Sequence, residues 1–214
     1  MVVVINEKAS IANHFLYELR HKGIQKDRAK FRLNLKKLGQ IMGYEVSKSL
    51  KYSTQQVETP LATANVELLS EQPVLVTILR ASIPFFNGFL DYFEQSDVAF
   101  IGEYRQEGTS EVSVKLDYVA APKIKGRPLI IIDPMLATGK SLIKAFNQLS
   151  VNGLPSSVHF VSAVAAPEGI NYIADHLSID YTIWTASLDE KLNEHSFIVP
   201  GLGDAGDLSF GEKL

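Results

Sequence analysis

Residues Leu129–Leu142 read LIIIDPMLATGKSL, an apolar run that is broken by an Asp-Pro pair and then passes into a short loop containing glycine and hydroxyl side chains. An apolar run, turn residues and then a helical pattern predict a strand–loop–helix unit, in which ligands bind beyond the carboxyl end of the strand. The helix is expected to begin near Ser141, because an amphipathic pattern runs from Ile143 to Leu149. Backbone N–H groups at a helix start attract anions, so the loop from Ala137 to Ser141 predicts a site for a phosphorylated ligand.

Two other interpretations of this loop have to be weighed. Any turn between a strand and a helix favours glycine and a capping serine, so the ATGKS string alone is weak evidence for a phosphate site. A Walker loop, G-x-x-x-x-G-K-[ST], requires glycine five residues before Gly139, and Pro134 stands there. Pro134 lacks an N–H group and has a fixed φ, so it cannot form the first bend of that phosphate cradle. The Walker interpretation is therefore excluded.

The complete string DPMLATGKS, from Asp133 to Ser141, resembles the signature with which type I phosphoribosyltransferases bind 5-phosphoribosyl 1-diphosphate (PRPP). Its DPMLATG form is closest to that of uracil phosphoribosyltransferases. A second segment, NEHSFIVPGLGDAGDLSFG from Asn193 to Gly211, resembles the uracil-recognition end of the same family. Shorter matches are ILRA at Ile78–Ala81, YR at Tyr104 and Arg105, and AAPEGI at Ala165–Ile170. By this resemblance the chain is identified as a member of the uracil phosphoribosyltransferase family.

The composition is that of an ordinary globular protein. A length of 214 residues predicts one domain, with a hood formed by the N-terminal region and residues 193–214. A net charge of −3 argues against a nucleic-acid or membrane-surface binder. The chain has no cysteine, which excludes disulfides, thiolate metal sites and a cysteine nucleophile. MVVVIN is too short for a signal peptide, and no apolar run approaches the roughly 20 residues of a membrane span. We therefore expect a cytoplasmic protein.

Strand-like and helix-like patterns alternate along the chain, which predicts an α/β fold with a mostly parallel, doubly wound sheet flanked by helices. The expected strands are Val2–Ile5, Val74–Leu79, Val98–Glu103, Leu129–Ile132, Val158–Val164 and Tyr181–Thr185. The expected helices are Ile11–Arg20, Arg28–Lys51, Pro84–Phe93, Ser141–Asn152 and Gly169–Leu177. The second of these, capped by Asp27, has an apolar face that suits either the core or a subunit interface.

Two segments depart from this alternation. Residues Gln106–Val119 are polar, contain a glycine and end in a period-two pattern, which predicts a hairpin arm. The resemblance implies a flexible arm that folds over the active site and excludes water. The segment after Asn193 is rich in glycine and has little periodicity, so we expect a structured loop and no helix there.

The resemblance implies how PRPP is bound. Phosphoribosyl transfer places positive charge on the ribose while diphosphate departs, so catalysis rests on positioning and electrostatics. The loop would hold the 5-phosphate, Asp133 the ribose hydroxyls, and two arginines the diphosphate. From the residues alone, Asp133 is equally a turn former. The expected PRPP-binding residues are Arg80, Arg105, Asp133, Pro134, Met135, Leu136, Ala137, Thr138, Gly139, Lys140, Ser141 and Asp204, of which Arg105, Asp133 and Asp204 are the expected catalytic residues.

Mg²⁺ is implied as a cofactor, because it binds through substrate phosphates, waters and one or two carboxylates. Asp204 is the expected protein carboxylate, and direct, water-mediated or sugar-only contact stays open; Asp207 is expected to have a turn role. Uracil presents two carbonyls and an N–H group, which a rigid loop can match with its own backbone while rejecting cytosine. By resemblance the uracil-binding residues are Ile198, Gly203, Asp204 and Ala205. Phe197 is expected to fill the hood, and His195 to be a hydrogen-bonding hood residue.

Two positions depart from the family pattern. Lys140 stands where the family usually has a second glycine, and Ser82, followed by Pro84, stands where glycine is usual in the first diphosphate loop. If position 140 requires a positive φ, a side chain there carries strain. The main hypothesis is a uracil phosphoribosyltransferase that makes UMP in pyrimidine salvage. The alternative is a PRPP or nucleotide sensor, or an RNA-binding pyrimidine regulator, of the same fold. The resemblance also suggests a homodimer or larger assembly, and GTP as an effector.

Overall fold

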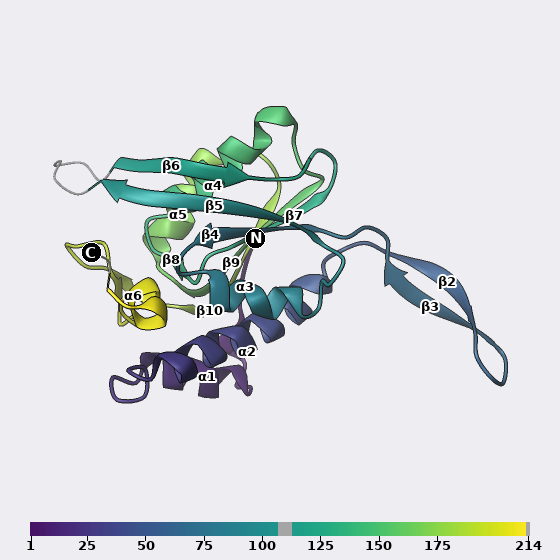
Figure 1. Cartoon of the computed structure of the whole chain (residues 1–214), viewed down its shortest axis with the longest axis horizontal. Coiled ribbons are helices and arrows are strands. Elements are labelled where there is room, and N and C mark those ends of the chain that lie inside the picture. Colours follow the sequence, from purple (N-terminus) through teal and green to yellow (C-terminus); the bar gives the residue numbers. More distant parts are fainter. Residues whose placement is uncertain (107–112, 213–214) are drawn as a thin grey trace.

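The computed structural model describes residues 1–106 and 113–212, and the side chains of residues 103–106, 113–117 and 152 lie outside this description. An eight-stranded sheet crosses the molecule in the order β1-β10-β9-β7-β4-β5-β6, with β8 beside β9 (Figure 1). All paired strands in it are parallel except β5 and β6. In this order they span Val2–Val4, Tyr181–Leu188, Ser157–Ala165, Pro128–Ile132, Val74–Leu79, Asp97–Gln106 and Ser113–Ala120, and β8 spans Met135–Leu136. The predicted mostly parallel α/β fold is confirmed.

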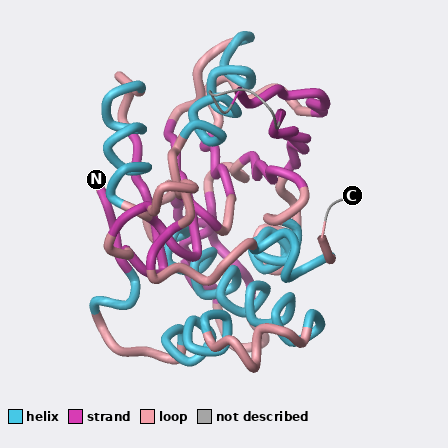
Figure 2. The backbone as a smooth tube through the Cα atoms, turned by 90° about the vertical axis from the view of Figure 1, so that its left-hand side faces the viewer, coloured by secondary structure: helices cyan, strands magenta, loops and turns pink. Residues whose placement is uncertain are grey.

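Helices cover both faces of the sheet (Figures 1 and 2). On one face lie α1 (Ala12–Arg20), α2 (Arg28–Ser47) and α3 (Ile83–Leu90), and on the other lie α4 (Lys140–Leu149) and α5 (Pro167–His176). Strand β7 shows why two cores form: Ile130 and Ile132 pack with the first layer, and Leu129 and Ile131 with the second. Because β7 is buried on both faces, it reads as one continuous apolar run in the sequence.

The long helix α2 belongs to the core. Asp27 caps it, accepting hydrogen bonds from the N–H groups of Ala29 and Lys30 at 3.0 and 3.1 Å. Its apolar face is buried within this chain, as Phe31 and Met42 show with exposed fractions of 1% and 0%. Of the two interpretations of that face, core and subunit interface, the structure supports the core. The helix ends at Ser47, four residues before the predicted end.

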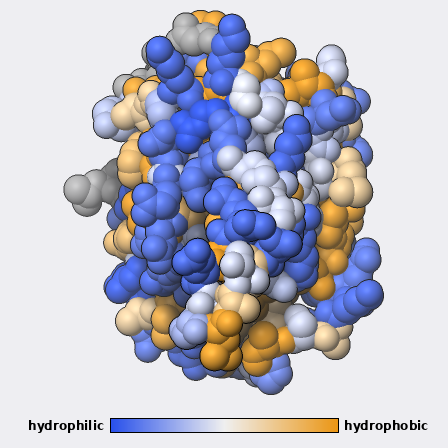
Figure 3. All heavy atoms as spheres, turned by 90° about the vertical axis from the view of Figure 1, so that its right-hand side faces the viewer, coloured by the Kyte–Doolittle hydropathy of each residue, from blue (hydrophilic) through white to orange (hydrophobic). Residues whose placement is uncertain are grey.

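A second, separate hairpin follows α2 and was not predicted. Among the described residues, strands β2 (Tyr52–Glu58) and β3 (Thr63–Leu69) pair with each other and with no other strand, and they project from the body of the molecule (Figure 1). Every residue of β2 is exposed. Since β2 has no core face, apolar and polar residues do not alternate along it, and the sequence offers no strand signal there. Figure 3 views the end from which the hairpin projects, where hydrophilic residues cover most of the face and hydrophobic ones lie in separate patches.

The predicted arm at Gln106–Val119 is in part outside the described residues. Strand β6 pairs antiparallel with β5, as a hairpin requires, and the register shifts between Gly102 and Glu103, as at a β-bulge. Residues 107–112, on which the expected closure over the active site depends, lie outside the described residues. Within the described residues, no helix is both long and apolar enough to cross a membrane.

The C-terminal segment contains more regular structure than predicted. Short strands β11 (Lys191–Leu192) and β12 (Ile198–Val199) pair antiparallel, and helix α6 spans Ala205–Phe210. The expectation that this segment has no helix is therefore wrong. Asp204 caps α6 by accepting from the N–H groups of Gly206 and Asp207 at 2.8 and 3.0 Å. With six residues, α6 is too short to show an amphipathic period in a glycine-rich sequence.

Candidate active site

A pocket of about 170 Å³ opens at the carboxyl ends of β4 and β7. These two strands are neighbours in the sheet. The chain continues from β4 to β5 on one side of the pair and from β7 to β9 on the other side. The pocket therefore lies at a topological switch point, where α/β sheets bind ligands. Among the expected site residues, those that line it are Arg80, Asp133, Met135, Leu136, Ala137, Thr138, Gly139, Ser141, Ile198, Gly203, Asp204 and Ala205. Pro134 and Lys140 are not part of the lining, and the side chain of Arg105 lies outside the described residues.

Residues 133–141, here called the phosphate loop, form the connection between β7 and α4. The N–H group of Met135 donates to the Asp133 carboxylate at 3.3 Å, and β8 pairs with β9 before the chain turns back. Gly139 is the N-cap of α4 and has a φ of 74°, a left-handed conformation that favours glycine. Because Gly139 has no side chain to cap the helix, the first turn of α4 presents its backbone amides to a ligand. The helix begins at Lys140, one residue earlier than predicted.

The phosphate loop packs directly against the start of α5. A Cβ atom on Gly139 would lie 2.7 Å from the carbonyl oxygen of Gly169, and a Cβ atom on Gly169 would lie 2.4 Å from that of Ala137. Two glycines therefore allow backbone to meet backbone. This contact gives a physical reason for the AAPEGI segment, whose glycine is Gly169.

The departure at Lys140 causes no backbone strain. Lys140 is the first residue of α4 and has a helical conformation, and its side chain is exposed. The only positive φ among the described non-glycine residues belongs to Ser196, at 62°. The positive φ in this loop falls on Gly139 instead, so position 140 does not require glycine.

Ser82 and Pro84 also fit the local structure. The buried hydroxyl of Ser82 lies 2.6 Å from that of Thr77 and donates to the carbonyl of Ile78 at 2.5 Å, so it bonds back to β4. Ser82 is not part of the pocket lining. Pro84 lies in the first turn of α3, where its missing N–H group costs no helical hydrogen bond.

Arg80 lies on the pocket wall directly after β4, and the peptide bond before it is cis. Its Nη2 atom donates to the Asp207 carboxylate at 3.1 Å and to the carbonyl of Gly211 at 3.2 Å. Its Nε atom is buried and has no hydrogen-bond partner among the described residues. A buried donor without a partner is costly, so an anionic ligand in this pocket would satisfy it. Asp207, expected to form a turn, lies in the first turn of α6 and pairs with Arg80.

Residues 198–206, here called the base loop, line the pocket beside the phosphate loop. Ile198 is 4% exposed and helps form this part of the lining. Phe197 is 44% exposed and lines the pocket, and its filling of the hood stays a prediction. The His195 ring is largely exposed, with Nε2 3.5 Å from the Glu194 carboxylate, and the backbone N–H group of His195 donates to the side-chain oxygen of Asn193.

Four residues that the sequence analysis missed hold the base loop or its surroundings. Asp189, Arg20 and Gln25 hydrogen-bond its backbone at Gly201 and Leu202. Glu168 accepts from the N–H group of Leu192 at 2.9 Å, and this bond lowers the pKa of its carboxyl group. Asp189 follows β10 directly, the same strand-end position that drew attention to Asp133, so a sequence signal exists for it. The sequence carries no such signal for Arg20 or Gln25.

The described residues hold no group of three or more His, Cys, Asp or Glu side chains that could bind a metal ion by themselves. Two carboxylates, Asp133 and Asp204, do line the pocket. This donor set fits Mg²⁺ that arrives with substrate phosphates, because such sites need only one or two protein carboxylates.

Comparison with known proteins identifies the family. The family model for uracil phosphoribosyltransferase matches residues 6–212. The chain belongs to the uracil phosphoribosyltransferase family. A uracil phosphoribosyltransferase from Porphyromonas gingivalis is 42% identical over 214 residues, which cover 100% of this chain and 99% of the relative. One from Pyrococcus furiosus is 37% identical over 202 residues, covering 93% and 85%. The solved structure of the AQ2163 protein from Aquifex aeolicus superposes with a TM-score of 0.87 at 31% identity, covering 99% of this chain and 98% of that one.

Membership in the uracil phosphoribosyltransferase family confirms the resemblance drawn from DPMLATGKS and from the segment Asn193–Gly211. The structure brings these two segments, which lie more than 50 positions apart in the sequence, into one pocket. In this member of the uracil phosphoribosyltransferase family, Lys140 and Ser82, the two positions expected to depart from the family pattern, are not part of that pocket's lining.

Proposed function

We propose that this chain transfers the 5-phosphoribosyl group of PRPP to uracil, giving UMP and diphosphate. A bond forms between C1 of the ribose and N1 of uracil, the bond from C1 to the diphosphate oxygen breaks, and the N1 proton of uracil is released. One observation carries the proposal. The phosphate loop, which suits an anion, and the base loop, which offers backbone groups, line the same pocket at the switch point of the sheet.

PRPP would lie with its 5-phosphate at the first turn of α4. The amides of this turn and the side chains of Thr138 and Ser141 are the donors that we assign to it. The Asp133 carboxylate, at the end of β7, would accept hydrogen bonds from the ribose hydroxyls. We assign Arg80 and Arg105 to the diphosphate, since a guanidinium binds phosphate oxygens at two points. The buried Nε atom of Arg80 supports this assignment.

The reaction would proceed by positioning and charge stabilisation. As the diphosphate leaves, the ribose ring gains positive charge, which the carboxylates of Asp133 and Asp204 would stabilise from the pocket wall. Arg105 would stabilise the departing diphosphate. We propose Asp204, with Asp133 nearby in the lining, as the protein carboxylate for Mg²⁺. When bound, Mg²⁺ would neutralise part of the negative charge of the diphosphate.

Uracil would bind against the base loop. Ile198 provides an apolar surface, and the backbone of Gly203, Asp204 and Ala205 provides donors and acceptors at the pocket. Backbone groups have fixed donor and acceptor character. Cytosine, which has an amino group where uracil has a carbonyl, would leave such groups unpaired.

A steady-state assay with PRPP, Mg²⁺ and uracil, followed by UMP formation, tests the proposed reaction. UMP from uracil, and none from cytosine in parallel, is the expected result. Protein that binds PRPP in calorimetry but forms no nucleotide with any base would overturn the proposed enzymatic activity and favour the sensor of the same fold.

Adding GTP to the assay tests whether GTP is an effector, as the resemblance suggests. We place the reaction in the cytoplasm, because a cysteine-free chain that uses a charged substrate suits that compartment.

We also propose that the chain forms a homodimer in which the β2–β3 hairpin lies against a second copy. A two-stranded hairpin is marginally stable in water on its own. This one is largely exposed and carries Leu61 at its turn, with an exposed fraction of 97%, and Val57 and Leu68 along its strands, 43% and 47% exposed. A covering partner would bury these side chains.

Deleting the hairpin tests the dimer. The N–H group of Ser70 donates to the carbonyl of Lys51 at 2.9 Å, so a short glycine turn can close the chain at this point. We expect the shortened chain to run as a monomer in light scattering and the full chain as a dimer. Equal masses per particle for the two proteins would contradict the role of the hairpin.

A further inference from the structure

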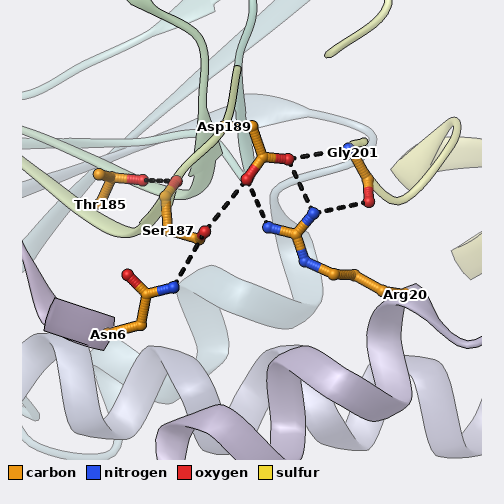
Figure 4. A network of polar contacts seen from close by, with 6 residues as sticks. All are labelled: Asn6, Arg20, Thr185, Ser187, Asp189 and Gly201. Atoms are coloured by element: carbon orange, nitrogen blue, oxygen red, sulfur yellow. Dashed lines mark hydrogen bonds and ion pairs between the residues drawn. The ribbon is translucent and has the colours of Figure 1, made fainter. Parts of the chain in front are cut away.

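The base loop is held by a network of side chains that do not line the pocket. Asp189 and Arg20 form a two-point ion pair, with Nη1 and Nη2 of Arg20 at 2.7 and 2.5 Å from the two carboxylate oxygens (Figure 4). Both side chains also bind the backbone of Gly201. The Asp189 carboxylate accepts from its N–H group at 2.8 Å, and Nη1 of Arg20 donates to its carbonyl at 2.9 Å. Each polar group of Gly201 is therefore fixed by one member of the ion pair.

The network is itself anchored to the sheet. The backbone N–H group of Asp189 donates to the carbonyl of Ala165 on β9 at 2.8 Å. Its carboxylate also accepts from the hydroxyl of Ser187 at 3.1 Å, and that hydroxyl accepts from the side chain of Asn6 (Figure 4). The Asp189 side chain is 3% exposed, so its orientation is determined by these partners. The carbonyl of Leu202 is held separately by Gln25 at 2.9 Å.

A buried ion pair contributes little net stability, because desolvation offsets most of the attraction between the charges. Here the ion pair acts instead by fixing the conformation of the base loop. The loop reads the base with backbone groups, and such groups recognise a ligand only where the turn places them. The turn is tight, since a Cβ atom on Gly201 would lie 2.1 Å from the carbonyl oxygen of Ile198. Gly201 is thus the point at which the loop is fixed, two residues before Gly203.

We propose that Arg20 and Asp189 are positioning residues that set the affinity for the base by fixing the backbone of Gly201. This inference rests on the proposed function, in which the base loop binds uracil. Neither residue lines the pocket, so neither contacts the substrate in this structure. The affinity for PRPP should change less than the affinity for uracil, because the phosphate loop itself is held by β9 and α5.

The test compares Asp189→Asn and Arg20→Lys with Asp97→Asn. The last variant breaks another Arg–Asp ion pair, between Arg127 and Asp97 at 2.6 Å, at the amino end of β5 and away from the pocket. We expect Asp189→Asn to raise KM for uracil at least tenfold and KM for PRPP by a clearly smaller factor. Arg20→Lys keeps the charge but loses the planar fork, so its KM for uracil should rise by an intermediate factor. Asp97→Asn should leave both constants unchanged.

Hydrogen exchange of the peptide spanning residues 196–206 gives a readout that does not depend on activity. Both network variants should exchange faster there, while peptides of the phosphate loop and the melting temperature of Arg20→Lys stay near wild type. Unchanged exchange and an unchanged KM for uracil in Asp189→Asn would overturn the positioning role. Wild-type protein without activity, whose variants nevertheless exchange faster in this peptide, would overturn the proposed function and leave the structural part of the inference intact.

Discussion

The phosphate loop, residues 133–141, is shaped mainly by one strand–loop–helix unit, whereas side chains up to 181 positions away hold the base loop, residues 198–206. In the first, β8 pairs with β9 and Gly139 begins α4. In the second, Arg20 and Gln25 of the N-terminal region bind Gly201 and Leu202. An anion site needs only backbone amides at a helix start, which a short sequence can encode. The proposed recognition of a planar base requires a loop of one defined shape, and the shape of the base loop depends on remote side chains.

The strongest challenge to this comparison is Gly139→Ala. The new Cβ would lie 2.7 Å from the backbone oxygen of Gly169 in a left-handed conformation, so the phosphate loop must move. We expect kcat/KM for PRPP to fall by roughly 10²–10³-fold, because small displacements in a positioning site have large effects on rate. Gly126→Ala is the control, since Gly126 has a φ of 76° and open space around it. If both variants lose activity equally, the close packing against α5 is not the cause.

Acid should weaken both regions together, because both depend on β9. His159 lies on this strand, 5% exposed, and its Nδ1 atom accepts from the Trp184 indole at 3.2 Å. Burial lowers its pKa from 6.5 to about 4. Below pH 6.5 the unfolded chain binds a proton that the folded chain does not. Stability should therefore fall by about 3 kcal/mol between pH 6.5 and 4.

Urea unfolding of the wild type and of His159→Gln over this pH range measures that contribution. Glutamine keeps an acceptor for the indole but does not titrate, so the variant should lose less stability in acid than the wild type. His176→Gln, on an exposed face of α5, serves as the control. Parallel pH profiles for the wild type and His159→Gln would contradict the assignment of a neutral buried imidazole.

Gly201→Ala should affect the base loop selectively. The Cβ would clash with the carbonyl of Ile198, and Gly201 has a φ of 60° that disfavours alanine. We expect KM for uracil to rise by roughly 30-fold with a smaller change in KM for PRPP, the reverse of the pattern for Gly139→Ala. Initial rates with each substrate varied in turn measure this. A change in KM for PRPP of similar size would show that the two loops respond as one unit.

The smallest expected effect concerns the ion pair between Arg80, on the pocket wall after β4, and Asp207, which directly follows the base loop. Asp207→Asn removes the competing carboxylate and leaves Arg80 free to bind diphosphate. Because both side chains are about one-third exposed, the change should be modest, a decrease in the Kd for PRPP of roughly threefold. Calorimetry of PRPP binding measures it. Weaker PRPP binding would instead indicate that Asp207 orients Arg80 for the diphosphate.

The sequence by itself determined the class of fold and predicted the chemistry of one site. Three local patterns carried this information: the buried strand Leu129–Ile132, its Asp-Pro break and the glycine at a helix start. Local patterns can be recognised in a sequence because residues that are neighbours in the chain form the structure. Two rare motifs added the family, and most of the residues carried over with them do line one pocket. Short elements such as α6 were not predicted, because six residues give no clear hydrophobic period.

Only the tertiary structure decided how the site is supported. The hairpin β2–β3, the pairing of Arg80 with Asp207 and the clamp of Arg20 and Asp189 on Gly201 join residues that nothing in the local sequence associates. The need for glycine at positions 139 and 169 likewise appears only when two backbones meet. Such contacts depend on where folded elements lie relative to one another. The geometry of the packed sheet and helices determines that placement, beyond the preferences of any single segment.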